Sequence, residues 1–181
     1  MVQVTPQDIL DFWFSDATEA HWFVRSDDLD QQIKQRFSAV YEQAVEGELA
    51  HWKNDAKSAL ALTIIFDQFP RNMFRGDPKA FASDPLACTL SKYALEHDYD
   101  MAVDEKARQF FYLPLMHSEV IEDQEQCVKL YKALGNDFAL GFAREHRDIV
   151  EEFGRFPHRN AVLGRKNTPE ETEFLKTHTG F

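Results

Sequence analysis

The most apolar stretch of the chain reads Ala59-Leu60-Ala61-Leu62-Thr63-Ile64-Ile65-Phe66 and runs directly into Asp67-Gln68-Phe69-Pro70-Arg71-Asn72. Because the first part is apolar on every side of a helix, it predicts a central helix that is buried all round. Proline stops a helix, so we expect this one to run from about Asp55 to Phe69. Asp67 would then lie at a helix C-terminus, where the helix dipole opposes negative charge. That placement predicts a polar site in which an arginine, Arg71 or Arg159, holds the carboxylate.

Parts of this stretch recur twice. Phe153-Gly154-Arg155-Phe156-Pro157-His158-Arg159-Asn160 repeats the aromatic residues, the proline and the Arg-Asn pair, and Phe110-Phe111-Tyr112-Leu113-Pro114-Leu115-Met116-His117 is a weaker copy. The prolines stand at positions 70, 114 and 157, and are therefore 44 and 43 residues apart. A period of this size is typical of stacked helix pairs, although three helices that simply end at a proline would give the same pattern. We expect Phe66, Phe69, Phe153 and Phe156 to be largely buried, because each precedes a turn that has to be anchored.

Signals for helix starts follow one another along the whole chain. Thr5-Pro6 and Thr168-Pro169-Glu170-Glu171 have the cap and the first-turn proline of a helix N-terminus. We expect further helix starts at Asp27 or Asp28, Asp77, Asp84, Asp104, Ser118 and Asn136. Apolar residues recur at helical spacing between these signals, and no segment alternates with the period of a strand. The sequence therefore predicts an all-α protein of about seven to nine helices, packed as antiparallel pairs in one domain over residues 1–181.

Composition and charge exclude several classes of protein. The net charge of −11 argues against a nucleic-acid binder and against a protein that binds anionic membranes. No apolar run approaches the length of a membrane span, and no signal peptide precedes the first helix. The two cysteines, Cys88 and Cys127, form neither a disulfide framework nor a metal motif. We therefore expect a cytoplasmic protein.

Three motifs of the chain resemble those of a known family. Asp67-Gln68-Phe69-Pro70-Arg71-Asn72, Phe111-Tyr112-Leu113-Pro114-Leu115-Met116-His117-Ser118-Glu119 and Gly154-Arg155-Phe156-Pro157-His158-Arg159-Asn160 are similar to those of a largely bacterial family of uncharacterised proteins, a domain of unknown function. The resemblance covers nearly the whole chain. It implies an all-helical fold similar to tetratricopeptide repeats, in agreement with the helix pairs expected above, and it implies no activity and no catalytic residues.

Acidic residues are absent from two short segments of this acidic chain. Residues 153–169 hold Arg155, Arg159, Arg165 and Lys166, and residues 69–76 hold two arginines. If the ends of these helices lie on one edge of the helix stack, they bring nine polar residues together. Several of these residues are arginines, whose forked guanidinium groups are suited to bind carboxylates and phosphates. These candidate ligand-binding residues are Asp67, Arg71, Asn72, His117, Glu119, Arg155, His158, Arg159 and Asn160.

Three functions fit this set of residues. The first is a helical-repeat-like binding module for a small anion or an acidic peptide terminus, because Asp67 and Glu119 leave about one positive charge unbalanced among the three arginines. The second is an enzyme in which His117 or His158 works with a carboxylate in acid–base chemistry on an anionic substrate. The third is a salt-bridge network without a ligand, in which Asn72 and Asn160 act as turn caps. We expect no cofactor and no metal, and the oligomeric state is left open.

Overall fold

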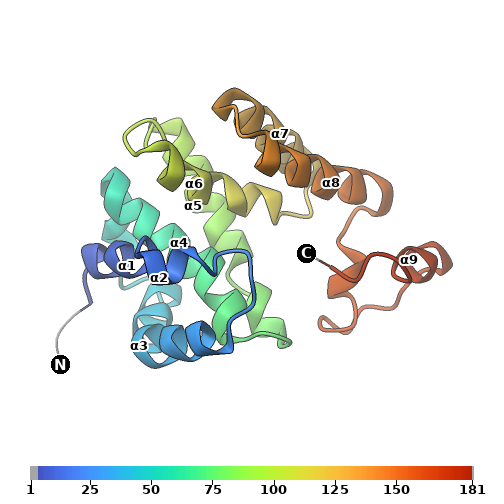
Figure 1. Ribbon diagram of the computed structural model, residues 1–181, viewed down its shortest axis with the longest axis horizontal. Coiled ribbons are helices and arrows are strands. Elements are labelled where there is room, and N and C mark those ends of the chain that lie inside the picture. Colours follow the sequence, from blue (N-terminus) through green and yellow to red (C-terminus); the bar gives the residue numbers. More distant parts are fainter. Residues whose placement is uncertain (1–3, 181) are drawn as a thin grey trace. The chain divides into compact units, whose positions relative to one another are not determined.

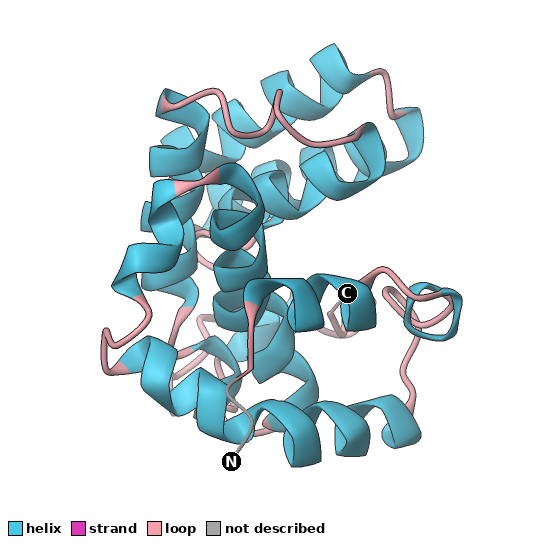
Figure 2. Ribbon diagram, turned by 90° about the vertical axis from the view of Figure 1, so that its left-hand side faces the viewer, coloured by secondary structure: helices cyan, strands magenta, loops and turns pink. Residues whose placement is uncertain are grey.

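The structure, a computed structural model, describes residues 4–180, and every regular element in that range is helical. Figure 2 shows helices joined by loops. Nine α-helices and three short 3-10 helices (η) are present within this range, which confirms the all-α prediction. No helix in it is long and apolar enough to cross a bilayer. The elements are α1 (Pro6–Trp13), α2 (Asp16–Glu19), α3 (Asp27–Val45), η1 (Ala50–Asn54), α4 (Ala56–Met73), η2 (Pro78–Phe81), α5 (Asp84–Glu96), α6 (Glu105–Met116), α7 (Ile121–Leu134), α8 (Asp137–Phe153), η3 (Pro157–Arg159) and α9 (Pro169–Phe174).

Several helices begin where the sequence predicts. Thr5 and Thr168 each form a complete capping box with the acid three residues later. Asp104 and Asn136 accept hydrogen bonds from the backbone of Ala107 (2.8 Å) and Ala139 (3.0 Å). These signals are local, since a cap and its backbone partner lie within one turn, and they can therefore be read without knowledge of the fold.

Two predicted caps are displaced by one or two residues toward the N-terminus. Ser26, not Asp27 or Asp28, accepts the hydrogen bond at the start of α3, and Ser83 precedes α5 where Asp84 was expected. In both cases a serine precedes the aspartate, so that the acid moves into the first helical turn. Acids in that position are still favoured by the helix dipole.

Pro70 does not end the central helix, and this prediction was wrong. Helix α4 continues through Pro70 to Met73, so Asp67 lies inside the helix and not at its C-terminus. Proline cannot donate to the carbonyl four residues earlier, which here belongs to Phe66. The buried Ser83 side chain donates to that carbonyl instead, at 2.6 Å. A donor from outside the helix thus replaces the missing bond.

The three prolines of the sequence repeat occupy different positions. Pro114 also lies inside a helix, α6, whereas Pro157 begins η3 after α8 has already ended at Phe153. The repeat in sequence therefore does not correspond to three equivalent helix ends.

The chain forms two compact units. The first contains residues up to 75 and 79–114, and the second contains residues 76–78 and those from 115 onwards. In the first unit, Phe69 is 0% exposed, and its ring lies 5.0 Å from that of Phe37 and 5.9 Å from that of Trp13. Trp22 covers this cluster, with its ring 4.7 Å from that of Phe110. The predicted burial of Phe69 is confirmed.

The second unit has its own small core. Helices α7 and α8 pack side by side, as the orange ribbons of Figure 1 show. Ile149, Val150 and Phe156 are buried together, and Ile121, Phe153 and Phe174 pack against them. Phe156 is fully buried as expected, whereas Phe153, also expected to be buried, is only partly covered.

Candidate functional site

The nine candidate residues divide between the two units. Three of them, Asp67, Arg71 and Asn72, lie on α4 in the first unit. The other six lie in the second unit, in the turn before α7 and in the segment that follows α8: His117, Glu119, Arg155, His158, Arg159 and Asn160. Each set makes contacts within its own unit, and these contacts define what its members can do.

Arg71 contacts two carboxylates in the first unit. Its Nη1 and Nη2 donate to the two oxygens of Asp84 at 2.8 and 3.1 Å, and Nη1 lies 3.5 Å from Oδ1 of Asp67. Nη1 also donates to the Asp67 carbonyl at 2.7 Å. Burial by itself lowers the pKa of Arg71, but the charges of Asp67 and Asp84 outweigh it and raise that pKa. Arg71 is therefore one cation that holds Asp67, as the sequence predicted.

Asn72 is joined to α3 through a shared acid. Its Nδ2 donates to Oδ1 of Asp30 at 2.8 Å, and Arg75 donates to both oxygens of the same carboxylate at 2.8 and 2.9 Å. Asn72 and Asp30 also line an open pocket of about 370 Å³ in the first unit. The side chain of Asn72 therefore ties α4 to α3, where the sequence suggested a turn cap.

Glu119 is the centre of a polar network in the second unit. Arg165 Nη1 and Nη2 donate to its two oxygens at 2.7 and 2.9 Å, and the backbone N–H of Phe156 donates to Oε1 at 2.8 Å. Burial by itself raises the pKa of Glu119, but these bonds and the charges of Arg165 and Arg159 outweigh it, so the pKa lies below its ordinary value. Glu119 is therefore ionised at neutral pH.

A second ion pair completes this network. Arg155 Nε and Nη2 donate to Glu171 at 2.6 and 2.8 Å, in the two-pronged geometry that suits a carboxylate. Asn160 donates to the same carboxylate at 3.1 Å and accepts from Arg165 Nε at 2.8 Å. The bond from Arg155 is the main cause that lowers the pKa of Glu171 to about 2. We call Glu119, Arg155, Asn160, Arg165 and Glu171 the anchor network.

Arg159 and three histidines form a second group, the Arg159 cluster: His117, His146, His158 and Arg159. The guanidinium carbon of Arg159 lies 4.6 Å from the centre of the Phe156 ring, and Nη2 donates to the carbonyl of His117 at 3.1 Å. His146 is buried, and its Nδ1 lies 2.8 Å from the carbonyl of Phe142. This burial makes His146 a core histidine.

The pKa of His146 lies below its ordinary value. Burial lowers this pKa most, and the neighbouring His117, Arg159 and His158 lower it further, whereas the bond to Phe142 acts in the opposite direction. The resulting value is about 3, so His146 is a neutral imidazole at physiological pH. His117 and His158 are partly exposed, and Arg159 is 7% exposed.

The sequence missed several partners of these residues. Asp84 had been read only as a helix cap and Glu171 only as part of a capping box, yet each holds an arginine side chain. Arg165 had been named in the basic segment but not among the candidate site residues, although it holds Glu119. The count that set two acids against three arginines was therefore incomplete. Contacts between residues far apart in sequence leave no local signal.

Comparison with known proteins identifies relatives by sequence and by structure. The family described as "Bacterial protein of unknown function (DUF924)" matches residues 9–179. The structure of a protein of unknown function from Agrobacterium tumefaciens, ATU0120, is 44% identical in sequence, with a TM-score of 0.90 over 96% of this chain and 97% of that one. No curated protein matches the chain.

Proposed function

The chain belongs to the DUF924 family of bacterial proteins of unknown function, and we propose that it is a binding module that takes a small anion at the Arg159 cluster of its second unit. The observation that carries the proposal is the convergence of Arg159, His146 and His158 on the Phe156 ring, at 4.6, 5.5 and 5.6 Å from its centre, with Arg159 Nη2 bonded to the His117 carbonyl. A guanidinium flanked by imidazole rings creates a local positive potential and offers N–H donors, and both attract an anion. Phosphate and carboxylate groups are the anions that such donors bind.

The position of Arg159 supports this proposal. Stacking on Phe156 and the bond from Nη2 to the His117 carbonyl both restrict the guanidinium. A restricted fork loses less conformational entropy when it binds than a mobile surface arginine does. His117 and His158 are partly exposed and can therefore be reached by a ligand.

The other candidate residues are proposed to position the site. The anchor network joins the turn before α7 to the segment after α8, through Glu119 and the Phe156 N–H on one side and Glu171 on the other. It thereby orders the turn that carries His158 and Arg159. Arg71 lies against two carboxylates and is a weaker candidate for an anion, because their charge opposes that of the ligand.

The acid–base enzyme considered from the sequence finds less support. An effective proton-transfer group has a pKa near the working pH. Glu119 is held ionised by Arg165, and its pKa is shifted further from neutrality. The third possibility, a salt-bridge network, describes the anchor network well, and we propose that this network supports the binding site.

The fold suggests how such a module is built. We propose that the helix pairs α3–α4 and α7–α8 are related to tetratricopeptide-like pairing, since each pair packs face to face. A two-residue connection between α7 and α8, with Gly135 in a left-handed conformation, supports an antiparallel hairpin there. The single domain and the cytoplasmic location expected from the sequence stay predictions.

Calorimetric titration with inorganic phosphate at pH 7 tests the proposed function. Arg159→Met keeps a flexible apolar stem and removes the guanidinium fork, so phosphate should bind it at least about tenfold more weakly than the wild type, as expected for loss of a charged hydrogen bond. Arg147→Met is the matched control, because Arg147 is a surface arginine of α8 in the same unit and pairs with Asp148.

Three outcomes decide the matter. Equal phosphate affinity in wild type and Arg159→Met would overturn the proposal, and so would the absence of binding at millimolar phosphate. Arg159→Lys keeps the charge without the fork, and it should bind with intermediate affinity. A circular dichroism melt of each variant shows that the comparison is made between folded proteins.

A further inference from the structure

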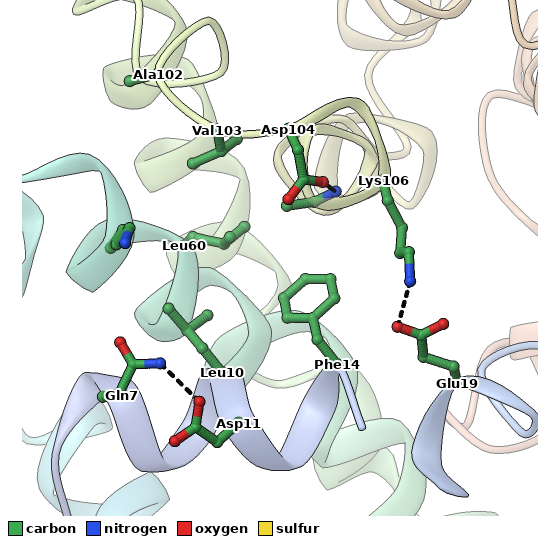
Figure 3. A pocket seen from close by; sticks show the side chains of 12 residues that line it. Gln7, Leu10, Asp11, Phe14, Glu19, Leu60, Ala102, Val103, Asp104 and Lys106 are labelled. Atoms are coloured by element: carbon green, nitrogen blue, oxygen red, sulfur yellow. Dashed lines mark hydrogen bonds and ion pairs between the residues drawn. The ribbon is translucent and has the colours of Figure 1, made fainter. Parts of the chain in front are cut away.

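A separate pocket lies in the first unit, and none of the nine candidate residues lines it. It has a volume of about 460 Å³ and opens among α1, the start of α4 and the segment that leads into α6. Figure 3 shows Leu10 and Asp11 of α1, and Phe14 directly after it, on one side, with Val103 and Asp104 on the other. Small-molecule sites usually measure about 300–1,000 Å³, so the pocket has room for a compact ligand.

Part of the pocket wall is apolar and rigid. Leu10 and Leu60 are buried residues of α1 and α4, and Phe14 adds the face or edge of an aromatic ring. Phe14 is held in place by Trp22 and Phe110, whose ring centres lie 5.5 Å from its own. A wall of this kind favours a hydrocarbon group over water.

Some charges at the rim are already paired. Lys106 donates to Glu19 at 2.6 Å, and Figure 3 shows this bridge beside Phe14. Asp104 accepts the backbone N–H of Ala107 at 2.8 Å as the cap of α6, and its charge also acts on Lys106. These residues form a neutral to weakly acidic boundary on one side of the pocket.

Two exposed side chains of opposite charge at the rim are not paired with each other. Asp11 accepts a hydrogen bond from Gln7 at Oδ1, at 2.7 Å, and its Oδ2 has no partner among residues 4–180. Lys57 lines the same pocket, and its Nζ pairs with no described residue, Asp11 included. A carboxylate and an ammonium that line one pocket without pairing are complementary to a ligand that carries both charges.

We propose that this pocket binds a free α-amino acid with an apolar side chain. Asp11 accepts hydrogen bonds from the ligand ammonium, Lys57 binds the ligand carboxylate, and Leu10, Phe14 and Leu60 contact the side chain. A simple amine satisfies only Asp11, and a simple carboxylate satisfies only Lys57. The zwitterion matches both, and its hydrocarbon group covers the apolar wall.

Ligand-detected NMR with L-leucine is the first test, with two analogues that each lack one charge. L-Leucinamide keeps the ammonium and lacks the carboxylate, whereas 4-methylpentanoate keeps the carboxylate and lacks the ammonium. We expect L-leucine to bind in the millimolar range and both analogues to bind about tenfold or more weakly. Leucinamide that binds as well as leucine would overturn the zwitterion proposal, and so would the absence of leucine binding at millimolar concentration.

Two variants locate the binding. Asp11→Asn removes the charge and keeps an oxygen for Gln7, and Lys57→Met keeps the aliphatic stem. Each should weaken L-leucine binding about tenfold, whereas the control Asp28→Asn, at an exposed acid of α3 outside the pocket, should leave it unchanged. Unchanged affinity in Asp11→Asn and Lys57→Met would contradict the proposal. Phosphate binding should be unaffected in all three variants, which separates this inference from the proposed anion site.

Discussion

Two copies of one sequence pattern, Phe-x-x-Phe-Pro, adopt different backbones in this protein. At residues 66–70 the helix α4 continues through the proline to Met73. At residues 153–157 the helix α8 ends at the first phenylalanine, and the proline begins η3. The second position of the pattern differs, because it is Asp67 in one copy and Gly154 in the other.

The comparison shows that glycine, not proline, decides where the helix ends. Gly154 has φ = 67° and donates its N–H to Val150 at 2.8 Å, which is a left-handed C-terminal cap. Asp67 keeps the helical conformation, and Ser83 satisfies the carbonyl that Pro70 leaves without its donor. The arginines after the prolines diverge as a result: Arg71 stays on a helix beside two acids, and Arg159 lies in a turn over Phe156.

Phe69→Ala should have the largest effect on stability. Phe69 is 0% exposed and contacts the rings of Phe12, Trp13 and Phe37, so its truncation should lower the free energy of unfolding by about 3–5 kcal/mol. Urea melts measure this loss. Phe138→Ala is the control, because Phe138 is 73% exposed, and it should cost less than about 0.5 kcal/mol. A loss below about 1 kcal/mol for Phe69→Ala would show that Phe69 is peripheral.

Ser83→Ala tests how the first copy tolerates its proline. The change leaves the buried Phe66 carbonyl without the donor that replaces the missing bond, and it should cost about 1–3 kcal/mol. Thr89→Ala is the comparison, since Thr89 makes a similar bond to the Pro85 carbonyl at an exposed position and should be nearly neutral. If thermal melts show equal effects for the two variants, Ser83 does not explain the continuous helix.

Gly154→Ala tests the helix end in the second copy. A side chain at φ = 67° is strained even though no atom lies within 4 Å of the added methyl group, so we expect a cost of about 1–2 kcal/mol. Gly141→Ala lies inside the same helix with equally open surroundings, and it should stabilise by about 0.5–1 kcal/mol. The same sign for both variants in urea melts would show that backbone conformation is not what distinguishes the two sites.

The anchor network, which holds the second copy through Arg155, predicts that the stability of the protein depends on pH. Because the folded pKa of Glu171, about 2, lies below its ordinary value of 4.5, the stability from its ion pair is present above that ordinary value and is lost as the pH falls toward 2. Glu171→Gln should therefore be less stable than wild type at neutral pH, and the difference should shrink between about pH 4.5 and 2. A difference that is independent of pH in urea melts would contradict this account.

Helix starts and buried aromatic residues were predictable because their causes are local. Thr5, Asn136 and Thr168 cap helices through partners within one turn, and a stretch apolar on all sides has to be buried. The continuation of α4 through Pro70 was not predictable, because it depends on a hydrogen bond from Ser83, which lies at the start of α5. Proline alone gives the wrong answer there.

The candidate site was predictable in its charges but not in its pairs. The basic segment after α8 does carry ion-paired arginines, but the partners of Arg155 and Arg165, Glu171 and Glu119, lie 16 and 46 residues away in sequence. Only the folded chain shows which arginine meets which acid. The sequence therefore predicted where the polar segments lie, but the count of their charges omitted the acids that pair with the arginines.

The most direct test of the proposed anion site is a proton NMR titration of the histidine rings with inorganic phosphate at pH 7. Bound phosphate changes the electric field at nearby rings, so the signals of His117 and His158 should move and then saturate. Those of His51 and His97, exposed residues of the first unit, should move little. The saturable movement should disappear in Arg159→Met. Signals of all four histidines that drift together without saturation, or that do not move, would contradict an anion site at the Arg159 cluster.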